Sequence, residues 1–179
     1  AAIERVRPLS PTTHTLHLTY GDKDRSPSSV QDWRARTHGS LTALLKAAGI
    51  DPRRISIETL DYPPAWFAPL VDPLDLAVCV DAGHIVLYGF DLQAVLDLFA
   101  RRITICHLHG VTDGKDHLSL DRLAPGARTI LQRFLQSFQG SLSLEIFSFE
   151  RLRDSLPCLV AMMDTGHVEE PPMRPYEER

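Results

Sequence analysis

Four short apolar segments of this sequence each carry an ionisable side chain at their carboxyl end. The four residues are Glu58 in ISIETL, Asp81 in VCVDAGH, His107 in ICHLHG and Glu145 in LSLEIF. If the segments are parallel strands, their carboxyl ends share one edge of a sheet, where the side chains converge. Carboxylates packed together repel one another and lose hydration, and a divalent cation between them removes both costs. We therefore interpret the four residues as metal ligands.

Each of these residues taken singly has a simpler explanation. A carboxylate at a strand end commonly caps a helix or pairs with a cation, and a single histidine is more often structural. The metal interpretation depends on the four occurring together. The alternation of side chains along a strand supports it, because small residues, Ser56 and Ser143, lie two positions before Glu58 and Glu145 on the same strand face.

Further imidazoles and one more carboxylate lie close to these positions in the sequence. The additional candidates are His84, three residues after Asp81, His109, two residues after His107, the pair Asp116 and His117 in the following loop, and, more weakly, His17 at the end of the first expected strand. Carboxylate and imidazole ligands without thiolates suit Zn²⁺, with Mn²⁺, Fe²⁺ or Co²⁺ as alternatives. Up to eight ligands exceed what one tetrahedral ion needs, which predicts two or three ions, or one ion with substrate-binding groups beside it.

Composition and charge narrow the class of protein. The 179 residues are 44% hydrophobic, the net charge is −4, and no basic block occurs, so we expect no nucleic-acid partner. No apolar run reaches the roughly 20 residues of a membrane span, and no signal peptide is visible. Cys79, Cys106 and Cys158 lie inside apolar runs, which predicts buried thiols in a reducing compartment. We expect a cytoplasmic protein with no membrane partner, in which thiol ligation is disfavoured.

The hydrophobic pattern predicts alternating strands and helices. Strands are expected over 13–20, 54–60, 75–81, 103–110 and 141–147; helices over 29–49, 90–102, 124–140 and 148–163; and a short helix or turn over 64–73. Residues 1–163 are expected to form one domain, and the proline-rich stretch 164–179 a solvated or disordered tail.

This alternation predicts an α/β fold with a parallel sheet and right-handed crossovers. An open doubly wound sheet and part of a (β/α)₈ barrel both fit the pattern. Five βα units fill the chain, whereas a complete barrel takes about 250 residues. The barrel interpretation therefore predicts that the chain holds the C-terminal five units and that three further units precede it.

The order and spacing of the site residues resemble those of the xylose-isomerase-like barrel superfamily over roughly residues 13–160. That superfamily includes metal-dependent sugar isomerases and epimerases, and apurinic-site endonucleases with three zinc ions. Within it, the stretches SIETLDYP, CVDAGHIVLYG, HLHGVTDGKDHLSLD and SLEIFS resemble the cobamide-remodelling phosphodiesterases. The resemblance implies that the metal ligands or their close neighbours are Glu58, Asp81, His84, His107, Asp116, His117 and Glu145. The endonucleases carry Asp-x-His where Asp116 and His117 are adjacent here, which puts one of these two in doubt as a ligand.

The resemblance implies metal-assisted hydrolysis of the phosphodiester in the nucleotide loop of a cobamide, a small-molecule substrate. Glu145 or Glu58 would bridge the ions, and His109 or His117 would orient the phosphate. Three alternatives stay open: a sugar isomerase or epimerase with Glu58 and Glu145 as paired acid and base, a DNA-repair nuclease, and a non-catalytic module that binds metal or cobamide. The acidic charge balance disfavours the nuclease, because duplex binding depends on basic phosphate contacts.

Overall fold

The computed structural model describes residues 2–164, so all but the first residue of the expected tail lies outside the described residues. Its main sheet has five strands, all parallel, in the order β1-β2-β3-β4-β7. The strands are β1 His14–Leu16, β2 Ile55–Glu58, β3 Ala77–Asp81, β4 Ile103–Leu108 and β7 Ser141–Leu144. Each main-sheet strand pairs with the next one along the chain, so the winding never reverses direction. A doubly wound sheet requires such a reversal, and the barrel alternative is therefore the correct one.

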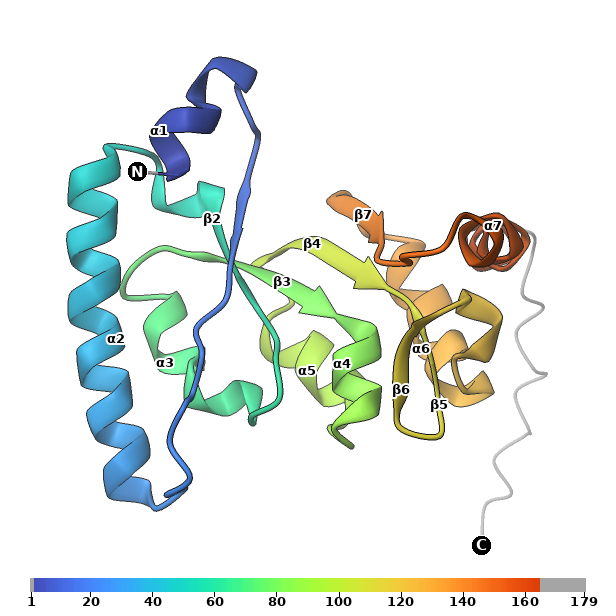
Figure 1. The fold of residues 1–179 in the computed structure, drawn as a ribbon, viewed down its shortest axis with the longest axis horizontal. Helices are drawn as coiled ribbons and strands as arrows, with labels where there is room; N and C mark the ends of the chain where they lie inside the picture. The colour runs from blue at the N-terminus through green and yellow to red at the C-terminus, as the bar shows by residue number, and fades with distance from the viewer. Residues whose placement is uncertain (1, 165–179) are drawn as a thin grey trace, which may run out of the picture.

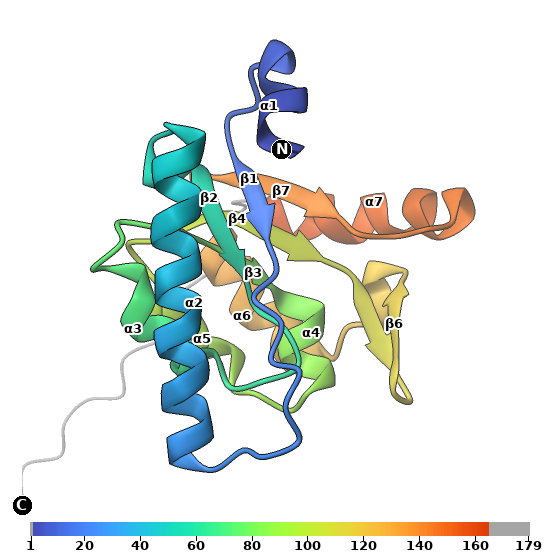
Figure 2. The same cartoon turned by 60° about the vertical axis from the view of Figure 1, so that its left-hand side comes forward.

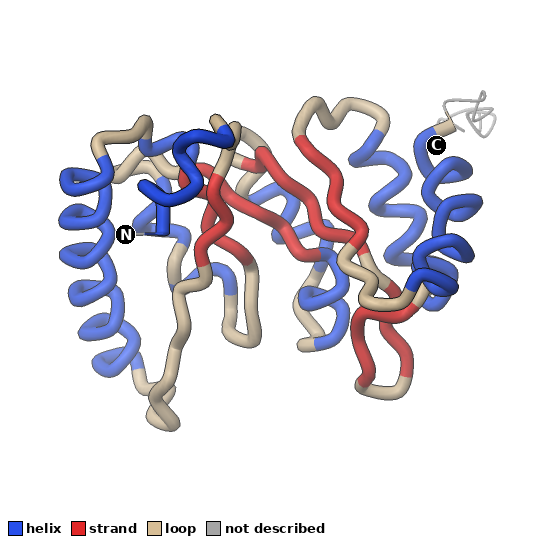
Figure 3. Tube along the Cα trace, turned by 45° about the horizontal axis from the view of Figure 1, so that its top comes forward, coloured by secondary structure: helices blue, strands red, loops and turns tan. Residues whose placement is uncertain are grey.

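The helices between the strands lie along one side of the curled sheet, while one helix precedes β1 and another follows β7 (Figures 1 and 3). They are α1 Ala2–Val6, α2 Pro27–Ala48, α3 Ala68–Val71, α4 Ala82–Leu87, α5 Leu92–Leu98, α6 Pro125–Leu135 and α7 Phe149–Met163. The core between sheet and helices is apolar, with Val78, Val80 and Leu108 from the strands fully buried and Val30 and Trp33 of α2 packed into the same cluster. Among the described residues, no helix combines the length and the apolar character that crossing a membrane requires.

Local sequence signals explain where the long helices begin and end. The Ser26 side chain accepts a hydrogen bond from the Ser29 backbone N–H at the start of α2, and Pro27 occupies its first turn. Gly49 ends α2 with φ 57°, a left-handed conformation that glycine adopts at little cost. Ser148 caps α7 in the same way, through the Arg151 N–H. Helix α7 ends at Met163 as expected, whereas α2 begins two residues before the expected start at 29 and ends one residue before the expected end at 49.

Two elements differ from the sequence expectation. Helix α4 begins directly after Asp81, where no helix was predicted, because the Asp81 carboxylate caps it by accepting from the His84 N–H at 2.8 Å. The expected loop after β4 is a two-stranded antiparallel hairpin of β5 Gly110–Thr112 and β6 Lys115–Leu118. Its turn residues, Asp113 and Gly114, both have positive φ, which is the geometry that Asp-Gly favours in tight hairpins. Figure 2 shows the hairpin extending beyond the carboxyl end of β4.

The expected strands are present but shorter. The first ends at Leu16, and the chain continues as extended coil to Tyr20. The strand expected to reach Gly110 ends at Leu108, and Gly110 begins the hairpin instead. A side chain at Gly110 could not fit, since an added Cβ would lie 2.0 Å from the Ser119 carbonyl oxygen. All three cysteines are free thiols, and two of them are buried, as predicted, whereas the third, on α7, is only partly buried.

Candidate metal centre

The structure brings together the four strand-end residues at the carboxyl edge of the sheet. Glu58, Asp81, His107 and Glu145 each offer one ligand atom, and these four atoms lie within 4.8 Å of one another. His107 Nδ1 lies 3.2 Å from Glu145 Oε1, 3.6 Å from Glu58 Oε2 and 3.9 Å from Asp81 Oδ2. The strand register causes this convergence, because Asp81 pairs directly with His107 across β3 and β4. We call these four residues the carboxylate cluster.

Several polar atoms around the cluster lack hydrogen-bond partners. Five buried side-chain atoms in the described residues make no well-aligned hydrogen bond, and three of them are Asp81 Oδ2, His107 Nδ1 and His109 Nε2, although His107 Nδ1 lies 3.2 Å from Glu145 Oε1 and His109 Nε2 lies 3.0 Å from Asp81 Oδ1. An unsatisfied buried polar group costs about 1–3 kcal/mol. Asp81 Oδ2 and His107 Nδ1 face the same space at 3.9 Å, and both are atoms that ligate divalent metals. The residues therefore fit a metal ion in this space.

Burial and neighbouring charges set the protonation of the two innermost carboxylates. Burial raises the pKa of Glu58 above its ordinary value, although the neighbouring histidines His107 and His17 oppose that shift. Burial also acts to raise the pKa of Asp81, but the His109 ring outweighs it, and the net shift is downward. Asp81 is thus held ionised by an imidazole, whereas Glu58 lacks sufficient counter-charge. A bound cation would supply that missing charge.

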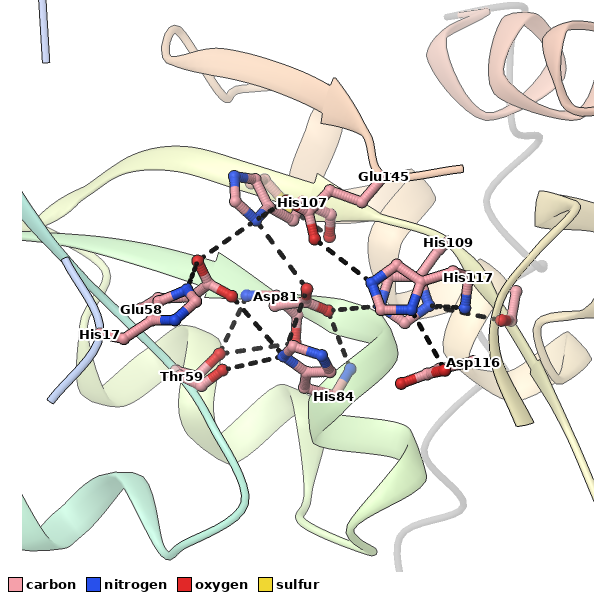
Figure 4. A network of polar contacts seen from close by, with 12 residues as sticks. His17, Glu58, Thr59, Asp81, His84, His107, His109, Asp116, His117 and Glu145 are labelled. Carbon is pink, nitrogen blue, oxygen red and sulfur yellow. Dashed lines mark hydrogen bonds and ion pairs between the residues drawn. The ribbon is translucent and has the colours of Figure 1, made fainter. Parts of the chain in front are cut away.

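A second group of possible ligands adjoins the first. His84 of α4, His109 after β4 and His117 of β6 also place ligand atoms within 4.8 Å of one another, and we call them the imidazole cluster. Their rings pack together, with the His109 and His117 planes stacked at 4.4 Å and His84 edge-on to both. Figure 4 shows that Asp81, a member of the carboxylate cluster, lies between Glu58 and the rings of the imidazole cluster. Asp81 connects them, because Oδ1 lies 3.0 Å from His109 Nε2 while Oδ2 faces His107.

The neighbours of each imidazole restrict which nitrogen is available. Asp116 Oδ1 lies 3.1 Å from His117 Nδ1, which leaves His117 Nε2 facing Glu145 Oε2 at 3.6 Å. His84 Nδ1 lies 3.3 Å from the Thr59 carbonyl oxygen. Such second partners commonly fix the tautomer of a metal-binding histidine. His109 differs, because its Nδ1 accepts the His117 backbone N–H and its side chain is fully buried.

His117 has a backbone conformation that is unfavourable for a non-glycine residue. Its φ is 51°, in the left-handed region, which costs roughly 1–2 kcal/mol for an L-residue. In this conformation its N–H donates to His109 Nδ1 at 3.1 Å and its ring stacks on the His109 ring. Such strain concentrates at functional sites. The hairpin therefore positions the His117 ring against the other two rings of the imidazole cluster.

The remaining predicted residues lie at the periphery. His17 Nε2 contacts Glu58 Oε2 at 3.0 Å from the coil after β1, and its side chain is 60% exposed. Asp116 contacts His117, and the pKa of Asp116 is lowered because the His117 ring outweighs the effect of burial. All nine predicted site residues thus lie in one connected network, while the role of each as ligand or catalyst remains a prediction.

Four residues in or beside the network were not predicted from the sequence. Thr59 is fully buried, and its Oγ1 accepts the Asp81 backbone N–H at 2.9 Å. Gly83 packs directly against the His109 ring. Cys79 places its sulfur within 4.8 Å of ligand atoms of Glu58 and His107. Phe147 stacks on His117 at 4.5 Å although 82% of it is exposed. Two of these residues had a signal in the sequence, because Gly83 directly follows the Asp81-Ala82 pair and Phe147 is an aromatic residue two positions after Glu145.

The curled parallel sheet of five strands is part of a parallel β/α barrel, and residues 2–164 supply five βα units of that fold. No protein-family model matches the chain, and no curated protein matches it. Several solved structures share its fold.

The TTHB071 protein from Thermus thermophilus, soaked with ZnCl₂, is 22% identical with a TM-score of 0.72, over 92% of this chain and 66% of that one. A D-tagatose 3-epimerase-like protein is 18% identical with a TM-score of 0.71, over 90% and 66%. A xylose isomerase domain protein from Planctomyces limnophilus is 16% identical with a TM-score of 0.63, over 89% and 61%. The chain thus spans 61% to 66% of the length of these proteins.

Proposed function

We propose that the protein is a metal-dependent hydrolase of phosphodiesters, and that its substrate is the nucleotide loop of a cobamide. The observation that carries the proposal is the presence of two adjoining ligand groups, the carboxylate cluster and the imidazole cluster, connected by Asp81. The carboxylate cluster by itself offers the four ligands that one tetrahedral ion needs, and the imidazole cluster offers further ligands beside it. Many metal-dependent nucleases and phosphatases use two ions, one at the attacking oxygen and one at the leaving oxygen.

The residues of this chain have separable roles in the proposal. The carboxylate cluster holds one ion, and His84 and His117, with one free nitrogen each, hold a second. When bound, the ions supply charge for the phosphate and a water of lowered pKa. His109 contacts neither solvent nor the surface, so we assign it to orienting Asp81 through their 3.0 Å contact. His117 is partly exposed, as is Glu145, and we place these two next to the substrate.

A specific observation favours a second candidate, a sugar isomerase or epimerase. Glu58 and Glu145 lie on either side of His107, at 3.6 Å and 3.2 Å, as paired acid and base groups around one ion would. The D-tagatose 3-epimerase-like protein shares the fold. In that reaction a second ion is unnecessary, so the imidazole cluster would have no catalytic task.

The two candidates differ in their dependence on His117. The test incubates the Zn²⁺- and Mn²⁺-loaded protein with a cobamide, with abasic duplex DNA and with a panel of ketoses, and separates the products by chromatography. We expect cleavage of the cobamide to a phosphorylated ring fragment and a free nucleoside. The His117→Ala variant should lose about 10²-fold or more in turnover, because it removes charge stabilisation of the transition state.

The matched control is His38→Ala, which removes an exposed imidazole on α2, away from the network, and should leave turnover unchanged. Activity confined to the ketoses and unaffected by His117→Ala would replace the hydrolase proposal with the isomerase. Retained metal with no turnover on any substrate would favour the non-catalytic binding module instead.

A further inference from the structure

One thiol lies on the ligand side of the sheet. Cys79 is two residues before Asp81 on β3, so the two side chains point to the same face of the strand. Cys106 lies on the neighbouring strand but pairs with Val80, whereas Asp81 pairs with His107, so Cys106 belongs to the opposite face. Both thiols are fully buried. The two cysteines are therefore alike in burial and differ in which face of the sheet they occupy.

The surroundings of Cys79 are those of a ligand and not of a core thiol. Its sulfur, a Glu58 oxygen and a His107 nitrogen lie within 4.8 Å of one another. The Glu58 side chain is 3% exposed and that of His107 is 9% exposed, and His107 Nδ1 has no hydrogen-bond partner. A thiol that served only to fill space would be expected among apolar side chains. Here it adjoins a buried carboxylate and a buried imidazole that is aimed at the same carboxylate.

The register of the sheet explains how the thiol reaches this position. The pairing of β3 with β4 shifts between Val78 and Cys79, so that Val78 pairs with Ile103 and Cys79 with Ile105. On its other side, Cys79 pairs directly with Glu58 of β2. The irregularity therefore lies directly at Cys79. Such irregularities re-aim side chains and are enriched beside active sites.

We propose that Cys79 is a sulfur ligand at the base of the carboxylate cluster, where with Glu58 and His107 it makes the centre select Zn²⁺ or Co²⁺ over Mn²⁺ and Mg²⁺. Soft thiolate ligands favour thiophilic ions, while purely oxygen and imidazole sites accept Mn²⁺ readily. On binding, the S–H bond breaks, the proton leaves to solvent, and the sulfur lone pair forms the bond to the ion, with no change in oxidation state. The inference rests on the metal centre of the proposed function and concerns which ion it holds.

The test is spectroscopic and needs no turnover. The metal-free protein is titrated with Co²⁺, and a sulfur-to-cobalt charge-transfer band is sought in the near ultraviolet. We expect this band in the unmodified protein and in Cys106→Ser, and its loss in Cys79→Ser. Competition between Zn²⁺ and Mn²⁺ should show a preference for Zn²⁺ that falls by about 10-fold or more in Cys79→Ser, because loss of a direct ligand should cost at least as much as the roughly 10-fold that changes in the surrounding shell cost.

Folding is checked separately, because a serine in this buried position could destabilise the sheet. Cys79→Ala provides the second variant, and circular dichroism of each metal-free variant establishes that it is folded. An absent band in the unmodified protein with cobalt bound, or a band that survives Cys79→Ser, would overturn the inference while leaving the hydrolase proposal standing. A band that behaves as expected in a protein without hydrolase activity would overturn only the proposed function. A protein that binds no cobalt would overturn both.

Discussion

Replacing Gly83 by alanine should disrupt the imidazole cluster. A Cβ on this residue would lie 2.0 Å from His109 Cε1 and 2.3 Å from both ring nitrogens. Carbon atoms in contact are separated by about 3.5–4.0 Å, so the ring would have to retreat by roughly 1.5 Å. The His117 ring stacks on it at 4.4 Å, and Asp81 contacts it at 3.0 Å. Neither contact can be kept after such a movement.

The expected cost follows from this overlap. Overpacking a buried site destabilises by about 1–3 kcal/mol. For a chain of this length each kcal/mol corresponds to about 2–4 °C in the melting temperature, so Gly83→Ala should lower it by about 2–12 °C. The second metal ion should be lost as well, because the displaced His109 ring no longer supports His117, one of the two residues proposed to hold that ion. Thermal unfolding and elemental analysis measure the two effects.

Two controls test whether the contact with His109 causes the effect of Gly83→Ala: the same substitution at another helical glycine, and Gly83→Ala in a protein that lacks the His109 ring. Gly39 lies inside α2 with nothing within 4 Å of its added Cβ, so Gly39→Ala should raise stability by about 1 kcal/mol. In a His109→Ala background the clash partner is gone, and Gly83→Ala should be neutral or stabilising there. If Gly83→Ala cost the same in both backgrounds, or nothing in either, the contact with His109 would not be the cause, and the reasoning would be refuted.

Three further changes have distinct expected results. Burial raises the pKa of Glu58 in the folded protein above the value of about 4.3 that a glutamate has in the unfolded chain. The neutral form of Glu58 therefore stabilises the metal-free fold at pH values below about 4.3, and this contribution is lost as the pH rises through the folded-state pKa. At neutral pH and with a chelator present, the Glu58→Gln variant should therefore have a higher melting temperature than the unmodified protein, although it should bind less metal. If the melting temperatures of the two proteins depended on pH in the same way, this expectation would be contradicted. Asp116→Asn removes the carboxylate 3.1 Å from His117 Nδ1 and should lower turnover about 10–100-fold with the carboxylate cluster still loaded, as kinetics and metal analysis would show. Phe147→Ala should change unfolding by less than about 0.5 kcal/mol, since the side chain is 82% exposed, yet lower turnover because His117 loses one of its two stacking partners; a large loss of stability would mean that Phe147 is structural.

Local sequence patterns determined most of the elements and the residues at the strand ends. The strands and helices follow from hydrophobic periodicity, and the ends of α2 and α7 follow from Ser26, Gly49 and Ser148. The convergence of Glu58, Asp81, His107 and Glu145 was also predictable, because parallel strands necessarily bring their carboxyl ends to one edge. These features depend on residues near one another in the chain, or on a rule that holds for any parallel sheet.

The tertiary structure alone decided the winding of the sheet and the second half of the site. Barrel and doubly wound folds share one local pattern, and only the order β1-β2-β3-β4-β7 distinguishes them. The imidazole cluster depends on the Asp81 cap that starts α4 and on the positive φ of His117, neither of which has a periodic signature. The approach of Gly83 to His109 and of Cys79 to Glu58 joins residues 26 and 21 positions apart, through contacts between different elements that no single segment encodes. Such contacts arise from packing between distant segments, whose energies local propensities do not contain.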